Sequence, residues 1–111
     1  MKALCLKEPW ASMIKDGKKT IETRKWKTSY RGNILLCASK YPKSALSGKA
    51  FAIAELADCR KMTEQDEIQA CCKIYPKANS WLLKNIRKIE PFSIKGSLGL
   101  FEVKNIAEIK K

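Results

Sequence analysis

The sequence predicts a single α+β domain built on a small mixed or antiparallel β-barrel of about five or six strands, flanked by two or more short helices. Short apolar runs bounded by turn-forming residues recur along the chain, as they do in closed or well-covered sheets. No long helical pattern separates consecutive runs, which argues against a doubly wound parallel sheet. With 111 residues and 45% hydrophobic composition, we expect residues 1–111 to form one domain around one core.

The chain begins with a strand and a short helix. Lys2–Leu6 alternates small and large apolar residues and is typical of a strand buried on both faces. Pro9 suits the first turn of a helix, and Gly17 supplies the left-handed residue that ends one. Between them, apolar residues recur at helical spacing at Trp10, Met13 and Ile14. We expect Trp10 to pack in the core rather than to form a ligand platform.

The remaining elements follow from apolar runs and stop signals. The other strands are predicted at Thr20–Thr28, Asn33–Ala38, Ala50–Cys59, Trp81–Ile89 and Leu98–Ile106. A second helix is predicted from a capping signal at Thr63–Asp66 to about Ile74, because Pro76 prevents its continuation. The segment Tyr41–Lys49 has loop composition and is either a flap beside a site or a plain surface connection.

The formal net charge of +12 favours polyanions or small anionic ligands as partners. A solvated basic surface without a site would also explain charge alone. The charge is densest between Lys15 and Arg31, where seven basic residues accompany two acids and two aromatic residues, Trp26 and Tyr30. Basic charge interleaved with aromatic rings is typical of surfaces that bind nucleic acid.

The five cysteines follow no repeated spacing, and the chain has no histidine. We therefore expect buried free thiols and no zinc site of the usual kind. We also expect no cofactor, although these features do not bear on an oxygen-ligated divalent cation. No apolar run approaches the roughly 18 residues of a membrane span, and no signal peptide is evident. These features predict a soluble, cytoplasmic protein without membrane association, and we favour a monomer.

Strand alternation groups the candidate site residues. If Thr20–Thr28 is extended, Glu22, Arg24 and Trp26 share one face, while Ile21, Thr23 and Lys25 point the other way. Alternation in the next long strand places Glu55 beside apolar neighbours. That acid is either a site residue or a solvated group at the barrel rim.

Four motifs resemble the ASCH domain (activating signal cointegrator homology), a branch of the PUA-like superfamily of small β-barrels associated with RNA. They are Pro9-Trp10-Ala11-Ser12, the pattern Gly17-x-Lys19-x-x-Glu22-x-Arg24, Tyr30-Arg31-Gly32 before a strand ending at Ala38-Ser39, and Pro91-x-x-x-Lys95-Gly96. Their order and spacing span nearly the whole chain.

The resemblance implies a cleft beside the first helix that binds RNA or a nucleotide-like small molecule. In that cleft Lys19 and Arg24 would contact phosphate or a base edge, and Glu22 would hold Arg24 or accept a base N–H. Trp26 or Tyr30 would stack on a base. The other candidate ligand contacts are Arg31, Ser39, Lys40 and Lys95.

Similarity to small bacterial members implies an alternative, an amidohydrolase acting on an acylated nucleoside such as N4-acetylcytidine. Those enzymes use the lysine of the pattern, a threonine at the position of Glu22 and a later glutamate, here Glu55, Glu64 or Glu67. The expected register of Thr20 and Thr23 does not let them replace that threonine. A ribonuclease resembling the metal-dependent member is less favoured, because no cluster of metal-binding acids is evident. The catalytic candidates are Lys19, Glu22 and Glu55.

Overall fold

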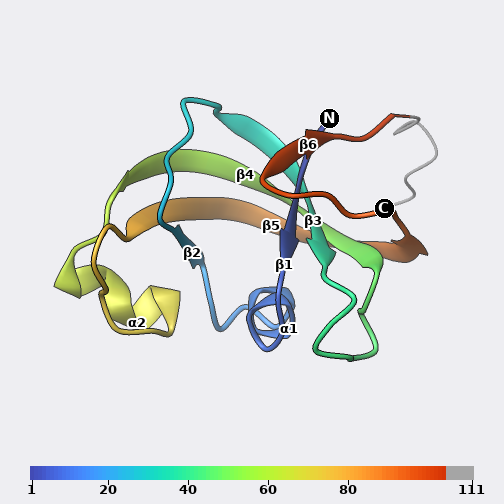
Figure 1. Cartoon of the computed structure of the whole chain (residues 1–111), viewed down its shortest axis with the longest axis horizontal. Helices are drawn as coiled ribbons and strands as arrows, with labels where there is room; N and C mark the ends of the chain where they lie inside the picture. Colours follow the sequence, from blue (N-terminus) through green and yellow to red (C-terminus); the bar gives the residue numbers. More distant parts are fainter. Residues whose placement is uncertain (105–111) are drawn as a thin grey trace.

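The computed structural model describes residues 1–104, which contain six strands and short helical segments (Figure 1). The elements in chain order are β1 (Lys2–Leu6), α1 (Trp10–Lys15), β2 (Ile21–Arg24), β3 (Gly32–Ala38), β4 (Lys49–Lys61), the 3-10 helix η1 (Glu64–Asp66), α2 (Glu67–Ala70), β5 (Asn79–Ser93) and β6 (Leu100–Glu102). The final residues of the predicted last strand, 105 and 106, lie outside the described residues. None of the helices within residues 1–104 is long or apolar enough to cross a bilayer.

The strands form one mixed sheet in the order β2-β5-β4-β3-β1-β6. The β1–β3 pair is parallel, with Leu4 opposite Leu36, and the other pairs are antiparallel. Within residues 1–104 the edge strands β2 and β6 are not paired with each other, so the sheet is a half-barrel. The predicted fold class, a small barrel-like mixed sheet with short helices, is confirmed.

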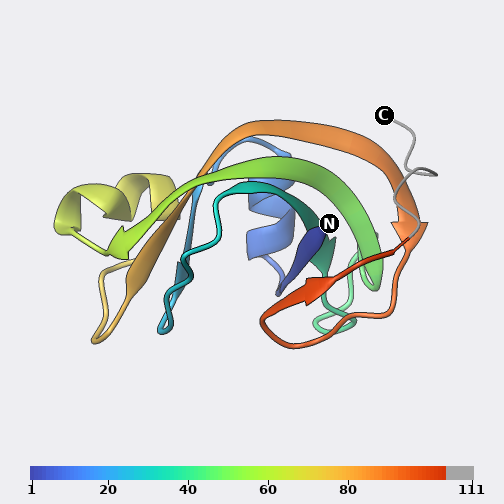
Figure 2. The same cartoon turned by 90° about the horizontal axis from the view of Figure 1, so that it is seen from above.

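The half-barrel is curved by its two longest strands. The pairing of β4 with β5 shifts register between Ala50 and Ala52, between Ile53 and Glu55, and between Leu56 and Asp58. Such irregularities bend a strand and increase its twist. Figure 2 shows the result, nested arches of β3, β4 and β5 with α1 on their concave side.

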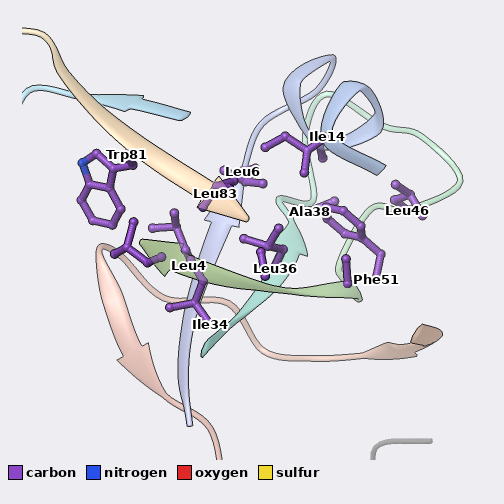
Figure 3. Close-up of a cluster of buried hydrophobic side chains, with 14 residues drawn as sticks. Leu4, Leu6, Ile14, Ile34, Leu36, Ala38, Leu46, Phe51, Trp81 and Leu83 are labelled. Carbon is purple, nitrogen blue, oxygen red and sulfur yellow. The ribbon is translucent and has the colours of Figure 1, made fainter. Parts of the chain in front are cut away.

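The core fills the space between this concave face and α1. Ile14 of α1 is fully buried against strand residues of the sheet (Figure 3). The largest buried strand side chains in this cluster are Leu4, Leu6, Ile34, Leu36, Phe51, Leu56 and Trp81. A second cluster on the other face contains Ala3, Leu35, Cys37, Ala50, Ile53 and Ile89. The strands β1 and β3 are therefore buried on both sides, which explains their nearly continuous apolar sequences.

The second helix is much shorter than the sequence predicts. It begins as expected, with Thr63 N–H donating to Asp66 Oδ2 at 3.0 Å, but it ends at Ala70 instead of Ile74. Cys71 adopts a left-handed conformation with φ 57°. Carbonyls of the last turn accept tertiary hydrogen bonds, that of Gln69 from Thr20 N–H and that of Ala70 from Lys19 Nζ. The chain ends the helix where the neighbouring segment satisfies these carbonyls.

The cysteines are also less buried than the sequence predicts. Cys37 is buried, whereas Cys5, Cys59, Cys71 and Cys72 are half-buried, and all five are free thiols. Cys5 is only half-buried because it lines two surface cavities. Cys71 and Cys72 follow the early end of α2 instead of lying inside a longer helix.

Asp66 joins η1 to the end of the long strands. Its carboxylate accepts two hydrogen bonds from Arg60, at 2.7 and 3.0 Å, and one from Ser80 Oγ at 2.8 Å. The Arg60 guanidinium, followed by the bonds from Thr63 and Ser80, holds the pKa of Asp66 well below its usual range despite burial. The charged carboxylate is thus a structural part of the fold.

We predict that Asp66→Asn lowers the free energy of unfolding by about 2–3 kcal/mol at pH 7, because buried Ser80 and bidentate Arg60 lose a charged acceptor. Asp58→Asn, at an exposed ion pair with Arg31 and Arg60, serves as the matched control and costs less than about 1 kcal/mol. Urea unfolding measures both.

The pH dependence of this difference has a definite sign. A lowered folded-state pKa stabilises the protein above the ordinary Asp pKa of about 4, and the contribution declines as the pH falls below that value. The gap between wild type and Asp66→Asn therefore shrinks from pH 5 to pH 2. Equal losses for both variants, or a constant gap, would contradict this assignment.

Candidate functional site

A cavity of about 450 Å³ lies beside α1 and β2 and is called here the Lys19 cavity. Its lining comes from segments far apart in the chain: Cys5, Lys7, Trp10, Lys19, Glu22, Thr23, Arg24, Ser39, Cys72, Tyr75, Ser97, Leu98 and Gly99. The structure thus brings together Lys19, Glu22 and Arg24, the central residues of the sequence pattern.

Local backbone geometry positions these three side chains. Gly17, with φ 81°, ends α1, and the carbonyl of Met13 accepts hydrogen bonds from the N–H groups of Lys18 and Lys19. The chain then enters β2, which pairs antiparallel with β5 so that Glu22 lies opposite Trp81. A left-handed turn followed by a sheet edge therefore directs the pattern toward the cavity.

Glu22 lies between two cations. Its Oε1 is 3.7 Å from Lys19 Nζ, and its Oε2 accepts a hydrogen bond from Arg24 Nε at 3.0 Å. Lys19 is 1% exposed and Glu22 6% exposed, so water contributes little to either charge. Lys19 Nζ also donates to the carbonyl of Ala70 and lies 5.0 Å from the centroid of the Trp10 ring. Buried charges of this kind are tolerated because each has several partners.

Arg24 is the least buried member of this group, with 23% of its side chain exposed. Its Nη2 donates to the carbonyl of Cys5 at 2.7 Å, which ties β2 to the end of β1. Within residues 1–104 the structure shows no partner for Arg24 Nη1. The guanidinium is therefore held in place while part of its donor fork remains available to a ligand.

The Lys19 cavity is also lined by two aromatic residues that were not predicted from the sequence as ligand contacts. Trp10 was expected in the core, but it is only partly buried and its ring faces Lys19. Its place in the Pro9-Trp10-Ala11-Ser12 motif was the available signal. Tyr75 follows α2 and had no distinguishing sequence signal. Its hydroxyl donates to Thr23 Oγ1 at 2.9 Å.

Thr23 corrects the predicted division of β2 into two faces. It was expected to point away from Glu22 and Arg24, yet it lines the same cavity. The reason is that β2 is an edge strand and the segment after α2 lies against it, with Cys72 Sγ 3.9 Å from Thr23 Oγ1. Both sides of this short strand therefore contribute to the cavity.

Trp26 does not line the Lys19 cavity, because β2 ends at Arg24 and the strand alternation ends with it. Its ring packs edge-on against Trp81, with centroids 4.7 Å apart. Tyr30 and Arg31 also lie outside the cavity. The Tyr30 hydroxyl donates to the carbonyl of Asn33, and Arg31 donates to the carbonyls of Thr28 and Tyr30. These residues organise the connection into β3.

The remaining predicted ligand contacts gather at a second, larger cavity of about 980 Å³, called here the Lys40 cavity. Lys40 and Lys95 line this cavity, and Ser39 lines both cavities.

The candidate catalytic residue Glu55 lines neither cavity and accepts a hydrogen bond from Asn85 at 2.9 Å. Glu64 and Glu67 also lie elsewhere, at the start of η1 and α2.

Residues 1–104 contain no group of three or more His, Cys, Asp or Glu side chains arranged to hold a metal ion. The chemistry of the Lys19 cavity is instead that of paired charges, hydroxyls and aromatic rings. Such a set can bind an anion, read a polar base edge and contact an aromatic ring face.

Cys5 lines both cavities and has an unusual thiol. The hydrogen bond with the Cys37 thiol, which burial partly opposes, lowers the pKa of Cys5 to about 7, and the nearby Arg24 charge contributes in the same direction. The same hydrogen bond with Cys5, together with burial, raises the pKa of Cys37. Near neutral pH, Cys5 is therefore the more reactive of the two thiols.

We predict that iodoacetamide alkylates Cys5 with a pH midpoint of about 7 and leaves buried Cys37 unmodified in the folded protein. Peptide mass spectrometry after timed labelling measures both rates. Cys37→Ala removes the main cause and moves the Cys5 midpoint upward, whereas Cys59→Ala, at a half-buried thiol on β4, leaves it unchanged. A wild-type midpoint near the ordinary value of about 8.5 would contradict this assignment.

Comparison with known proteins agrees with the fold and the sequence pattern. The family model of the ASCH domain matches residues 4–93. A crystal structure of ASCH from Zymomonas mobilis has a TM-score of 0.75 at 14% identity, covering 99% of this chain and 96% of that one. Two mutants of that protein have TM-scores of 0.71 and 0.68 at 13% and 15% identity, covering 98% and 94% of this chain and 98% and 88% of theirs.

No match was found among the curated proteins. At these low identities the solved structures establish the fold alone, while the family model spans most of the sequence. The resemblance found in the motifs is thereby confirmed, and the chain belongs to the ASCH domain family.

Proposed function

We propose that this ASCH domain binds RNA and holds one unstacked nucleotide in the Lys19 cavity. One observation carries the proposal: the buried Lys19–Glu22–Arg24 group presents Arg24 to a cavity that Trp10 also lines. A fixed guanidinium beside an aromatic ring suits a ligand that has both an anionic or polar edge and a flat face.

The charge of the Lys19 cavity favours an anionic ligand. Lys7, Lys19 and Arg24 line it, and Glu22 is the one acid among the described lining residues. Because Glu22 is paired with two of these cations, its charge is largely compensated inside the group. The net positive charge of the whole chain, +12, adds a long-range attraction for polyanions.

The proposed roles follow from the contacts. Arg24, held by Glu22 and the Cys5 carbonyl, donates to a phosphate or a base oxygen. The Glu22 carboxylate has lone pairs beyond its two ion pairs and can accept a base N–H. Trp10 and Tyr75, rather than Trp26, supply aromatic surface, and a stacked base gains roughly 1–3 kcal/mol. The cavity of about 450 Å³ is within the usual size of a small-ligand site.

We predict that Arg24→Ala weakens binding to RNA by about 10- to 100-fold, the range expected for losing charge-assisted hydrogen bonds. Lys25→Ala is the control, since Lys25 is the exposed neighbour, lines neither cavity and changes the net charge equally. The measurement is fluorescence anisotropy with a labelled single-stranded RNA octamer pool of random sequence. Lys19 is a poorer choice for substitution because its contact with Ala70 also supports α2.

Salt dependence provides a second readout of the same proposal. For the wild type, the logarithm of the binding constant falls linearly with the logarithm of the salt concentration. Each phosphate contact with a single strand contributes roughly −0.7 to this slope. Equal losses for Arg24→Ala and Lys25→Ala would assign binding to diffuse charge alone. A flat salt response together with tight binding of an uncharged nucleoside would also contradict RNA binding.

A second candidate function, hydrolysis of an acylated nucleoside, is favoured by one specific observation. Lys19, Glu22 and the hydroxyl of Thr23 line the same cavity, although the threonine follows the expected position by one residue. Against it, Lys19 Nζ is engaged as a donor to Ala70 and in an ion pair with Glu22, which suits charge stabilisation better than nucleophilic attack.

Incubation with N4-acetylcytidine separates the two candidates, because hydrolysis consumes one water and releases acetate and cytidine. We predict no turnover above the uncatalysed rate at high protein concentration, measured by liquid chromatography. Release of cytidine that Glu22→Gln abolishes and Lys25→Ala leaves intact would replace the binding proposal with the enzymatic one.

A further inference from the structure

We propose that the Lys40 cavity binds the sugar–phosphate backbone of the nucleotide next to the one in the Lys19 cavity, so that the ligand class is a nucleic-acid strand and not a free nucleotide. This inference rests on the proposed function of the Lys19 cavity and adds to it a second subsite. Adjacency, chemistry and available charge carry the inference.

The two cavities are adjacent, and together they are called here the groove. Cys5, Ser39, Ser97 and Leu98 line both of them. The groove lies where the parallel strands β1 and β3 end side by side, with Leu6 opposite Ala38, and Ser39 is the first residue after β3. A ligand that extends from the Lys19 cavity past Ser39 therefore enters the Lys40 cavity.

The chemistry changes along the groove. The Lys19 cavity contains the aromatic residues Trp10 and Tyr75 and the acid Glu22, which suit a base. None of the described residues that line the Lys40 cavity is aromatic or acidic. Its polar side chains are the lysines and serines Ser39, Lys40, Ser47, Ser93, Lys95 and Ser97. Cationic and hydroxyl donors without stacking surfaces suit phosphate and sugar oxygens.

The lysines of the Lys40 cavity have charge to offer a ligand. Lys40 and Lys95 are exposed, and no carboxylate in the described part of the chain lies within 4.0 Å of either ammonium group. They lie on different loops, one after β3 and the other after β5, so a bound strand would pass between them.

Backbone hydrogen bonds join these two loops. Gly48 N–H donates to the carbonyl of Ala38 at 3.0 Å, and the Gly48 carbonyl accepts from Ile94 N–H at 3.0 Å. Gly48 has φ 70°, which favours glycine, and a Cβ there would lie 3.8 Å from Lys40 Cγ. The walls of the Lys40 cavity are therefore set by the fold, as a preorganised binding site requires.

The test varies two things, the length of the RNA ligand and the lysines of the Lys40 cavity. Binding of the four ribonucleoside 5′-monophosphates is measured by calorimetry, and binding of the random RNA octamer pool by anisotropy across a salt series. The test variant is the double substitution Lys40→Ala and Lys95→Ala. The matched control is Lys84→Ala with Lys88→Ala, two exposed β5 lysines that line neither cavity and lower the net charge equally. Circular dichroism and thermal unfolding check that both variants fold.

We predict that wild type binds the octamer at least about 10-fold more tightly than any mononucleotide. The Lys40 and Lys95 variant loses about 10-fold in octamer affinity and lowers the salt slope by about 1.4, the value for two phosphate contacts, while mononucleotide binding changes less than about 2-fold. The Lys84 and Lys88 control retains the wild-type slope.

The outcomes distinguish this inference from the function on which it rests. If mononucleotides bind and the octamer binds no more tightly, the Lys40 cavity has no backbone subsite, while the nucleotide site of the Lys19 cavity stands. Equal losses in the test and control variants would likewise overturn the inference. If neither ligand binds wild type, the proposed function of the Lys19 cavity fails as well.

Discussion

The paired contacts of Glu22 with Lys19 and Arg24 hold together four parts of the molecule. Lys19 extends from the turn after α1 to the last carbonyl of α2, and Arg24 extends from β2 to the end of β1. Glu22 joins the two cations, with Oε1 3.7 Å from Lys19 Nζ and Oε2 3.0 Å from Arg24 Nε. Each charge would be costly to bury alone, so the three residues act as a unit. The shape of the Lys19 cavity and the early end of α2 both depend on this unit.

The arrangement of the strands explains why the groove lies where it does. The strands β1 and β3 are the parallel pair of an otherwise antiparallel sheet, so both end on the same side of it. The chain continues from β1 into α1 and from β3 into the loop that contains Lys40. The curvature of β4 and β5 brings the loop after β5 to that edge as well. Three connecting segments thus meet above one end of the sheet. Loops carried on a rigid scaffold in this way are common locations of binding sites.

Periodicity predicted most of the fold because the strands and α1 are defined by their own residues, as Gly17 and the apolar run of β3 show. The spacing of Lys19, Glu22 and Arg24 likewise identified residues that share a cavity. The failures depend on contacts between distant segments. Trp26 does not share a face with Glu22 and Arg24 as predicted, because β2 ends after four residues. The predicted second helix is longer than α2, because Lys19 and Thr20 donate hydrogen bonds to the last carbonyls of α2 and end it early. Tyr75 meets Thr23 across about fifty residues of chain, which no local pattern contains.

The position of Cys5 has a practical consequence for ligand discovery. Cys5 is half-buried and lines both the Lys19 and the Lys40 cavity, while Cys37, which pairs with it in the sheet, is buried. A disulfide-tethering screen anchored at this one sulfur would present fragments to either half of the groove. Fragments captured in the two directions could then be joined through a common attachment point. The natural sequence thus already contains a cysteine beside the site, which such screens usually introduce by mutation.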